Sequence, residues 1–467
     1  MSRALAWVPA LLLLGSLQAR AQPSPDPADA AQPAAPPPAE TTPAAEPGPE
    51  PGPDPSPDPS PEPGAEPGAE PGPEPSAEPW PDRFQPLELG DEEARLRLSF
   101  IAQLQLSIEN REAGDGQRQT DSSARIRRIR TLLRGAFLDG RVQSTLHLEV
   151  APGAAELIDL FVDVALTRGL RLRVGQFKIP LTQYWQQSLT QLGTLDWSIT
   201  SRTFGGERQL GLMAHDGAGG GEGLRYALGL FAGENRRGAL ARELPRIYGE
   251  SHGNASSLLA PRPAGALHAE LVGRVGHFAA ELHPETLFDA QGGGLRHGLS
   301  FSAAWDTEPE HARDWGLRLA PEILLKWRGL SLVTIGYFGL APMADGALEP
   351  AGLGVLVELG WQPHRRVQIG LRYARVALLE ALRGDARVYA QALRPTDPAD
   401  LLAMDAWDAA YGGVGALEGR HELSLAIHTL LVGRSLAWQN DLSWLRAERA
   451  GGARDDLRLR SQLQLAF

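Results

Sequence analysis

The sequence predicts an all-β fold: a 16-stranded antiparallel transmembrane β-barrel preceded by a disordered segment rich in proline and acidic residues. Three observations predict it. Apolar and polar side chains alternate in sixteen separate runs between residue 95 and the C-terminus. Most of the even-numbered links between these runs are short turns. Outside the first 21 residues, no window holds the 18 or so consecutive apolar residues that a transmembrane helix needs.

The first 21 residues have the pattern of a secretory signal peptide. Arg3 precedes an apolar core around Leu11–Leu14, and small residues mark a cleavage site at Ala19-Arg20-Ala21. The apolar core is too short to span a bilayer. We therefore expect residues 1–21 to be removed and the mature chain to act outside the cytoplasm.

Residues 22–90 form a proline and acid repeat with fourteen acidic residues and one basic residue, Arg83. Such a segment has too few large apolar side chains to offset its ordering entropy, so it predicts a disordered, semi-extended periplasmic linker. An unselected hydrophilic spacer is the alternative interpretation. The net charge of -12 belongs to this segment, and the chain has no cysteine, which excludes disulfides and thiolate chemistry.

Residues 91–467 carry the predicted barrel. In the first run, Leu96, Leu98 and Phe100 alternate with Arg95, Arg97 and Ser99, which is the period of a strand with one apolar face. The predicted strands are 95–108, 125–138, 141–150, 157–166, 170–175, 208–215, 224–232, 267–281, 295–305, 315–327, 330–340, 353–361, 367–375, 422–432, 436–445 and 457–467.

The turns fix the expected register. A two-residue hairpin at Asp139-Gly140 pairs residues whose numbers sum to 279, so Arg130 faces Glu149 and polar side chains meet polar ones. The Arg328-Gly329 turn places Trp327 opposite Leu330 in the same way. Long links at 176–206, 233–266 and 376–421 lie at the other edge, a pattern typical of an outer-membrane barrel with a periplasmic N-terminus.

Two further features concern strand faces. Pro321 lies on the apolar face of the tenth strand and predicts a bulge or a strand end, because proline donates no ladder hydrogen bond. Aromatic residues near strand ends on the apolar face predict an interfacial girdle. These residues are Trp305, Trp315, Trp327, Trp361, Tyr373, Trp438 and Trp444.

The last strand ends in Leu463, Leu465 and the terminal Phe467 on one face. This ending resembles the signal that the outer-membrane barrel assembly machinery reads. It predicts that machinery and outer-membrane lipid as partners.

The segments RIRRIRTLLRGAFLDGRVQSTLHLEV, LIDLFVDVAL, LRLRVGQFKIPLTQYWQQS and RTFGGERQLGLM resemble the phosphate-selective porin O and P family over about residues 125–230. The signature is Gly175-Gln176-Phe177-Lys178 followed by Pro180. The resemblance implies a homotrimeric porin in the outer membrane of a Gram-negative bacterium. It also implies a third loop that folds into the lumen and constricts it.

Eight basic residues are candidates for an anion path through the barrel, because charges at the narrowest part of a channel set its selectivity. They are Arg128, Arg130, Arg134, Arg171, Arg173, Lys178, Arg202 and Arg208. The alternative is ordinary cross-strand ion pairing, with Arg130 facing Glu149 and Arg173 facing Asp163. Arg134 faces Thr145 instead and is the better candidate.

The function that these features predict is passive diffusion of small hydrophilic solutes, with anions preferred and phosphate among them. Lysine occurs only at Lys178 and Lys326, which weakens the case for phosphate. A plugged structural or adhesive barrel is the alternative. An enzymatic barrel is a third class, but His147, His215, His297 and His428 are scattered without a serine motif or paired carboxylates. We predict no catalytic residues, no metal, no cofactor and no nucleic-acid partner.

Overall fold

The computed structural model describes thirteen stretches of the chain. They are residues 86–91, 93–112, 117–151, 154–205, 208–217, 223–232, 269–279, 287–290, 292–306, 316–342, 348–379, 417–449 and 452–467. The predicted signal peptide and residues 22–85 of the predicted linker lie outside the described residues.

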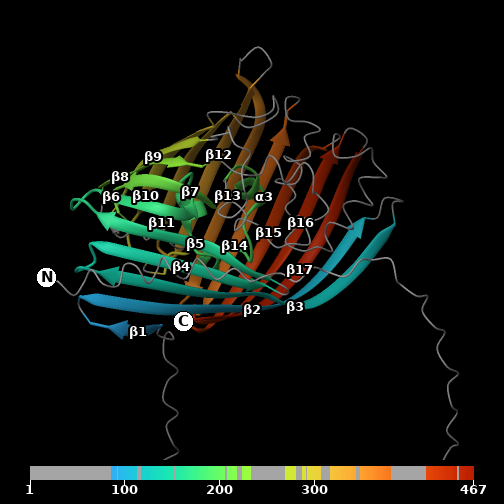
Figure 1. Cartoon of the computed structure of the whole chain (residues 1–467). Coiled ribbons are helices and arrows are strands. Elements are labelled where there is room, and N and C mark those ends of the chain that lie inside the picture. The colour runs from blue at the N-terminus through green and yellow to red at the C-terminus, as the bar shows by residue number, and fades with distance from the viewer. Residues whose placement is uncertain are drawn as a thin grey trace, which may run out of the picture. The chain divides into compact units, whose positions relative to one another are not determined.

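The described strands form one antiparallel sheet that closes on itself (Figure 1). From β2 onward each strand pairs with the next along the chain, and β17 pairs with β2, which closes a barrel of sixteen strands. The bounds of the strands are β1 Leu87–Gly90, β2 Ala94–Glu112, β3 Arg118–Phe137, β4 Val142–Ala151, β5 Ala154–Ala165, β6 Arg171–Lys178, β7 Arg208–His215, β8 Gly223–Phe231, β9 Glu270–Phe278, β10 Arg296–Asp306, β11 Leu317–Trp327, β12 Leu330–Pro342, β13 Leu348–His364, β14 Val367–Leu378, β15 Leu417–Val432, β16 Leu436–Arg449 and β17 Gly452–Ala466. The strands β2 to β17 correspond one to one with the sixteen predicted runs, so the predicted fold class is confirmed.

Side chains alternate between the two sides of the wall. On β2, Leu104 and Leu106 point outward and are 52% and 59% exposed, whereas Gln103 and Gln105 point inward and are 1% and 3% exposed. The inward glutamines are hydrogen-bonded to glutamines of β17. Each of the sixteen barrel strands contributes at least one large, exposed apolar side chain to the outer surface. The barrel is therefore apolar outside and polar over much of its inner wall.

Two tight turns have the register that the sequence predicted. Phe137 pairs with Val142 and Arg130 with Glu149, as the sum of 279 requires. Trp327 pairs with Leu330 across Arg328-Gly329, where both residues of the turn have positive φ. We call the edge of the barrel that holds these turns the short-turn rim, and the opposite edge the long-loop rim.

Pro321 differs from its expectation. It lies in the middle of β11 with no shift of register on either side, so there is no bulge and no strand end at this residue. The ladder to β12 omits Pro321, as a residue without an N–H must. The neighbouring Gly336 leaves room for the proline ring, because a Cβ there would already touch Pro321 Cγ at 3.4 Å.

The two ends of the barrel chain meet on β2. Leu87–Gly90, the last residues of the predicted linker, form β1 and pair with β2 next to the end of β17. Phe467 follows β17 and exchanges two backbone hydrogen bonds with Phe100, at 2.8 and 3.0 Å. Its ring lies 5.6 Å from that of Phe100 and is exposed on the outer face, as is Leu463.

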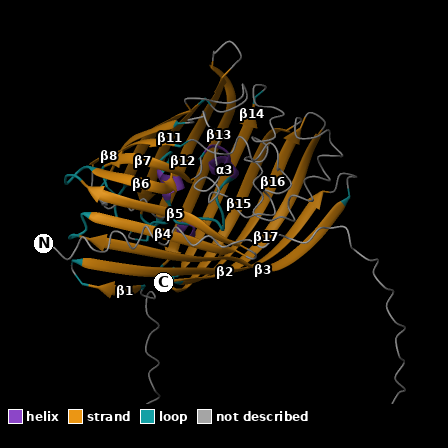
Figure 2. Cartoon of the chain, in the orientation of Figure 1, coloured by secondary structure: helices purple, strands orange, loops and turns teal. Residues whose placement is uncertain are grey.

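In the part of the chain that the structure describes, the helices are short and lie within the ring of strands (Figure 2). They are α2 Gln183–Gln186, η3 Leu189–Gln191 and α3 Ile199–Phe204, all in the connection between β6 and β7. None of the described helices is long and apolar enough to cross a membrane. Their apolar side chains pack on the inner wall and form an apolar core inside part of the barrel, which includes Tyr184, Leu192, Phe204, Ile335 and Tyr337.

Candidate functional site

The connection between β6 and β7 folds into the barrel, and we call its described residues, 179–205, loop 3. It follows Lys178, whose Nζ donates to the carbonyl oxygens of Trp185 and Gln187 at 2.8 and 2.9 Å. Carbonyls at a helix end lack intrahelical partners, so the lysine caps the end of α2. At the start of α2, the Thr182 hydroxyl accepts a hydrogen bond from Trp185 N at 3.0 Å. Local capping therefore shapes this part of loop 3.

Carboxylates on the opposite wall hold loop 3 by its backbone. Glu322 of β11 accepts hydrogen bonds from Gln183 N and Tyr184 N, both at 2.7 Å. Glu422 of β15 accepts one from Ile199 N at 2.9 Å. These N–H groups belong to the first turns of α2 and α3, where helices leave donors without partners and favour negative charge. Glu322 and Glu422 therefore hold the loop by its backbone.

Arg372 of β14 is 1% exposed and joins the loop to a further carboxylate of the wall, Glu358 of β13. Its Nε donates to Glu358 at 2.8 Å, its Nη2 to the Tyr184 hydroxyl at 2.7 Å and its Nη1 to the Asp196 carbonyl at 2.8 Å. The Tyr184 hydroxyl in turn donates to Glu358 at 2.8 Å. Burial raises the pKa of Tyr184 well above its usual value, so the hydroxyl keeps its proton.

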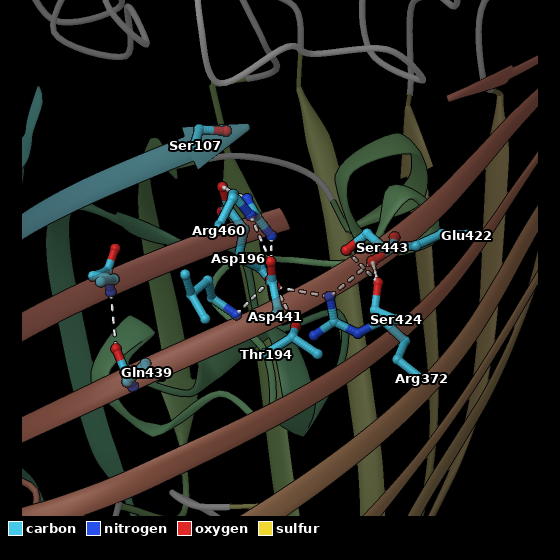
Figure 3. Close-up of polar contacts among 12 residues, drawn as sticks. Ser107, Thr194, Asp196, Arg372, Glu422, Ser424, Gln439, Asp441, Ser443 and Arg460 are labelled. Carbon is cyan, nitrogen blue, oxygen red and sulfur yellow. Dashed lines mark hydrogen bonds and ion pairs between the residues drawn. The ribbon is translucent and has the colours of Figure 1, made fainter. Parts of the chain in front are cut away.

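Asp196 is the centre of a second buried cluster (Figure 3). Its carboxylate lies 2.6 Å from Arg202 of the loop, 3.3 Å from Arg127 of β3 and 3.9 Å from Arg460 of β17. Burial alone would raise the pKa of the Asp196 carboxyl. The positive charges of Arg202, Arg127, Arg128 and Arg460 lower this pKa by more than burial raises it, so it lies well below its usual value. Asp196 is therefore a carboxylate that ties loop 3 to the wall on the side of β3 and β17.

A bulge in β3 turns two consecutive arginines into the lumen. Gln103 pairs with Arg128 and Leu104 with Ile126, which leaves Arg127 as the extra residue. Arg127 and Arg128 are 7% and 4% exposed. Among the described residues, no acceptor is hydrogen-bonded to Arg128 Nε or Nη1. Arg128 is thus a buried cation with unused donors.

The other two candidates on β3 have different surroundings. Arg130 forms an ion pair with Glu149, the residue opposite it, so the predicted cross-strand pair is present. Arg134 lies opposite Thr145, as predicted, and is exposed near the short-turn rim.

Strands β5, β6 and β7 carry a cluster around Asp163. Arg171 Nε lies 2.8 Å from one carboxylate oxygen, and Arg173 Nη2 lies 2.7 Å from the other. His215 Nε2 approaches the same carboxylate at 3.1 Å. The predicted pair of Asp163 and Arg173 is therefore present, but two guanidinium groups share one carboxylate.

A neighbouring cluster on the same wall contains the last of the predicted residues. Asp159 of β5 lies 2.7 Å from Arg208 Nε and 2.8 Å from His147 Nδ1. The eight predicted basic residues thus fall into separate groups: three on β3, three around Asp163 and Asp159, and Lys178 and Arg202 in contacts that shape loop 3.

Sequence reasoning missed several residues of this network. Arg127 had a signal, because two adjacent arginines cannot both face the lumen in a regular strand. Arg372 and Arg460 could have been found by extending the inward register along β14 and β17. Glu322 could have been placed on the inner face of β11 in the same way, but its contact with loop 3 and the role of Asp196 had no such signal, because loop 3 has no periodicity.

The connection between β9 and β10 also enters the barrel. Leu287 and Phe288 are each 1% exposed, and Phe288 makes an edge contact with His428 of β15 at 5.8 Å. The guanidinium of Arg434 lies 5.6 Å from the centre of the Phe288 ring and donates to the Thr190 carbonyl of loop 3 at 2.9 Å. Loop 3 therefore reaches as far as the short-turn rim.

Comparisons with known proteins assign no family to the chain. No protein-family model matches the sequence, and no curated protein shows significant similarity to it. Solved structures that resemble the chain include outer-membrane porins. The outer membrane channel DcaP of Acinetobacter baumannii is 10% identical over 82% of this chain and 100% of that chain, with a TM-score of 0.47.

Two further porins give similar values. An anion-selective porin from Comamonas acidovorans is 12% identical over 80% of this chain and 100% of that chain, with a TM-score of 0.47. OmpF of Salmonella typhi is 10% identical over 81% and 100%, also with a TM-score of 0.47. Membership of the phosphate-selective family stays a prediction.

Proposed function

We propose that this chain is an outer-membrane porin through which small hydrophilic solutes diffuse, with anions preferred. The observation that carries the proposal is that apolar side chains face outward and polar side chains face inward, the reverse of the usual arrangement in a soluble protein. Exposed leucine, isoleucine, valine and aromatic side chains cover the outer face of all sixteen strands, while glutamine, serine and charged side chains face inward on much of the wall. Soluble monomers rarely expose continuous apolar surface beyond a few hundred Å².

The outer face has the further features of a membrane barrel. Trp327, Trp361 and Trp438 are exposed near the short-turn rim and Trp305 at the opposite end of its strand, as interfacial aromatic residues would be. Trp315 of the predicted girdle lies outside the described residues. In a closed wall of antiparallel strands, backbone N–H and C=O groups bond to the neighbouring strands, which lipid demands.

The anion preference is argued from the charges of β3 and β5–β7. Asp163 balances one of its two guanidinium partners, Arg171 and Arg173, and Arg128 has unused donors, so this side of the lumen carries an excess of positive charge. A narrow passage beside such groups favours anions. Loop 3 would provide the narrowing, because it crosses from β6 to the wall of β11–β16.

Other parts of the proposal extend expectations from the sequence. The N-terminal linker would lie in the periplasm, since β1 lies at the short-turn rim. Phe467, Leu465 and Leu463 would serve as the signal for the barrel assembly machinery. Phosphate as a natural solute and a homotrimer remain expectations of the family resemblance.

A plugged barrel without channel activity is the second candidate, and a specific observation favours it. Loop 3 and Leu287-Phe288 build an apolar core against the inner wall, and inward polar side chains such as Gln462 and Gln464 are 1% exposed. In this case the loops that fill the lumen, rather than a passage, would be the functional surface.

Single-channel recording in a planar lipid bilayer distinguishes the two. Stepwise conductance from the refolded barrel is expected for a porin, whereas a barrel that inserts but passes no current contradicts the porin and favours the plug. With a salt gradient across the bilayer, the reversal potential should then indicate anion preference. A cation preference would contradict the assignment of the arginine clusters.

A further inference from the structure

The outer face near the short-turn rim has a groove of about 540 Å³ between strands β11, β12, β13 and β14. Its outermost row runs across neighbouring strands through Trp327, Leu330 and Trp361, which are directly paired. Leucines fill the next row, including Leu332 and its partner Leu359. The volume is in the range of small-molecule sites, and the lining is almost entirely apolar. This groove fits a hydrocarbon chain.

The mouth of the groove is basic. Arg328 lies in the turn between β11 and β12, and its guanidinium lies 5.4 Å from the centre of the Trp327 ring. Arg365 and Arg366 are exposed in the next turn. The two turns touch, since Gln362 N donates to the Gly329 carbonyl at 2.8 Å. Three arginines therefore lie in the two touching turns at this end of the groove.

The backbone at Arg328 gives a second, independent reason to consider this site. Arg328 has a φ of +48° at the first position of a two-residue hairpin turn. Asparagine, aspartate or glycine is the usual residue there, because a side chain such as arginine is strained at positive φ. The stacked contact with Trp327 holds the cation at the groove in spite of that strain.

We propose that this groove binds a phospholipid with an anionic headgroup, with an acyl chain between Trp327 and Trp361 and the phosphate against Arg328, Arg365 and Arg366. This inference rests on the proposed function, because it requires the outer face to lie in a bilayer. The apolar slot recognises the chain, and the arginines recognise the charge of the headgroup. The short-turn rim is the edge we place in the periplasm, so the ligand comes from the inner leaflet.

The test uses the full-length mature protein in a non-ionic detergent. Phosphatidylglycerol and phosphatidylcholine with identical acyl chains are titrated separately, and bound lipid is counted by native mass spectrometry. We expect phosphatidylglycerol to bind several-fold more tightly. Arg328→Asn removes the cation but suits the turn, so the variant should fold and should bind phosphatidylglycerol about fivefold more weakly.

Two control variants separate the parts of the site. Arg168→Asn makes the same change at an exposed residue of another short turn and should leave binding unchanged. Trp361→Ala removes one side of the slot and should weaken both lipids alike. Equal affinity for both lipids in the wild-type protein, or no effect of Arg328→Asn, would overturn the inference, as would cross-linking that finds a second copy of the chain covering Trp361.

Conductance is measured on the same preparation to distinguish this inference from the proposed function. A protein that forms channels but binds both lipids equally contradicts only the lipid site. A protein that selects phosphatidylglycerol but passes no current supports the lipid site and contradicts only the porin.

Discussion

Asp196→Asn should release loop 3 from the wall. The side chain of Asp196 contacts Arg202 at 2.6 Å, Arg127 at 3.3 Å and Arg460 at 3.9 Å. Asparagine keeps the shape but removes the charge, so three guanidinium groups lose their shared carboxylate. Arg460 still has Asp441, at 2.9 Å, but the buried Arg127 loses the charge of its carboxylate partner.

The size of the effect follows from the burial of the cluster. Removing one partner of a buried ion pair typically costs about 3–5 kcal/mol, because the remaining charge is left uncompensated. At about 1.4 kcal/mol per factor of ten, the ratio of undocked to docked loop rises by roughly two to four orders of magnitude. The carbonyl of Asp196 still accepts from Arg372, so the loop should fluctuate rather than leave permanently.

Single-channel recording at high salt is the assay, because high salt suppresses direct effects of charge on the current. We expect Asp196→Asn to show a larger conductance and frequent transitions between levels. Asp163→Asn is the matched control: it also removes a buried carboxylate shared by arginines, but one that touches no residue of loop 3 among its described partners. If the two variants gave the same current, or if Asp196→Asn behaved like wild type, docking by Asp196 would be refuted.

Four further predictions concern other variants of the protein and its dependence on pH. Arg134→Ala should reduce anion preference in reversal-potential measurements, and an unchanged potential would remove its assigned role. Because the pKa of Asp196 is lowered, its contribution to docking is present above the usual aspartate pKa and is lost only as pH falls through the lowered value; the difference in single-channel noise between Asp196→Asn and the wild-type protein should therefore stay constant from pH 7 to about pH 4. Deleting Phe467 should lower the yield of assembled barrel in the outer membrane, measured by heat-modifiable mobility on gels, whereas normal yield would exclude it as a signal. Gly370→Ala places a Cβ 2.5 Å from the Gly193 carbonyl of loop 3, which should cost about 1–3 kcal/mol and increase conductance fluctuations.

Periodicity explains why the wall was predictable and why much of the lumen was not. A strand that has one face in lipid must alternate, so β2 could be predicted from the alternation of apolar residues such as Leu104 with polar residues such as Gln105. Where a short hairpin joins two strands, its geometry also fixes the register between them. The pairs of Arg130 with Glu149 and Arg173 with Asp163 followed from that register.

The docking of loop 3 depends on contacts without a sequence period. Backbone N–H groups such as Gln183 N bind Glu322, and no local pattern links residues so far apart in the chain. The bulge at Arg127 was not predicted either. A single extra residue exchanges the inner and outer faces for every residue that precedes it in the strand. Charges that look like a continuous track in sequence, such as Arg173 and Arg202, therefore belong to different contacts in space.

Variants at Gly370 and Asp196 distinguish the effect of the position of loop 3 from the effect of the charge of the lumen. Asp196→Asn changes both, whereas Gly370→Ala displaces the loop at its backbone and leaves every charge in place. Gly273→Ala is the control for adding a methyl group to the wall, since a Cβ there meets its nearest neighbour at an ordinary 3.8 Å. If loop position sets conductance and wall charges set selectivity, Gly370→Ala should alter the current and preserve the reversal potential. A shift of the reversal potential in Gly370→Ala would mean that the loop itself carries the selectivity, through Arg202.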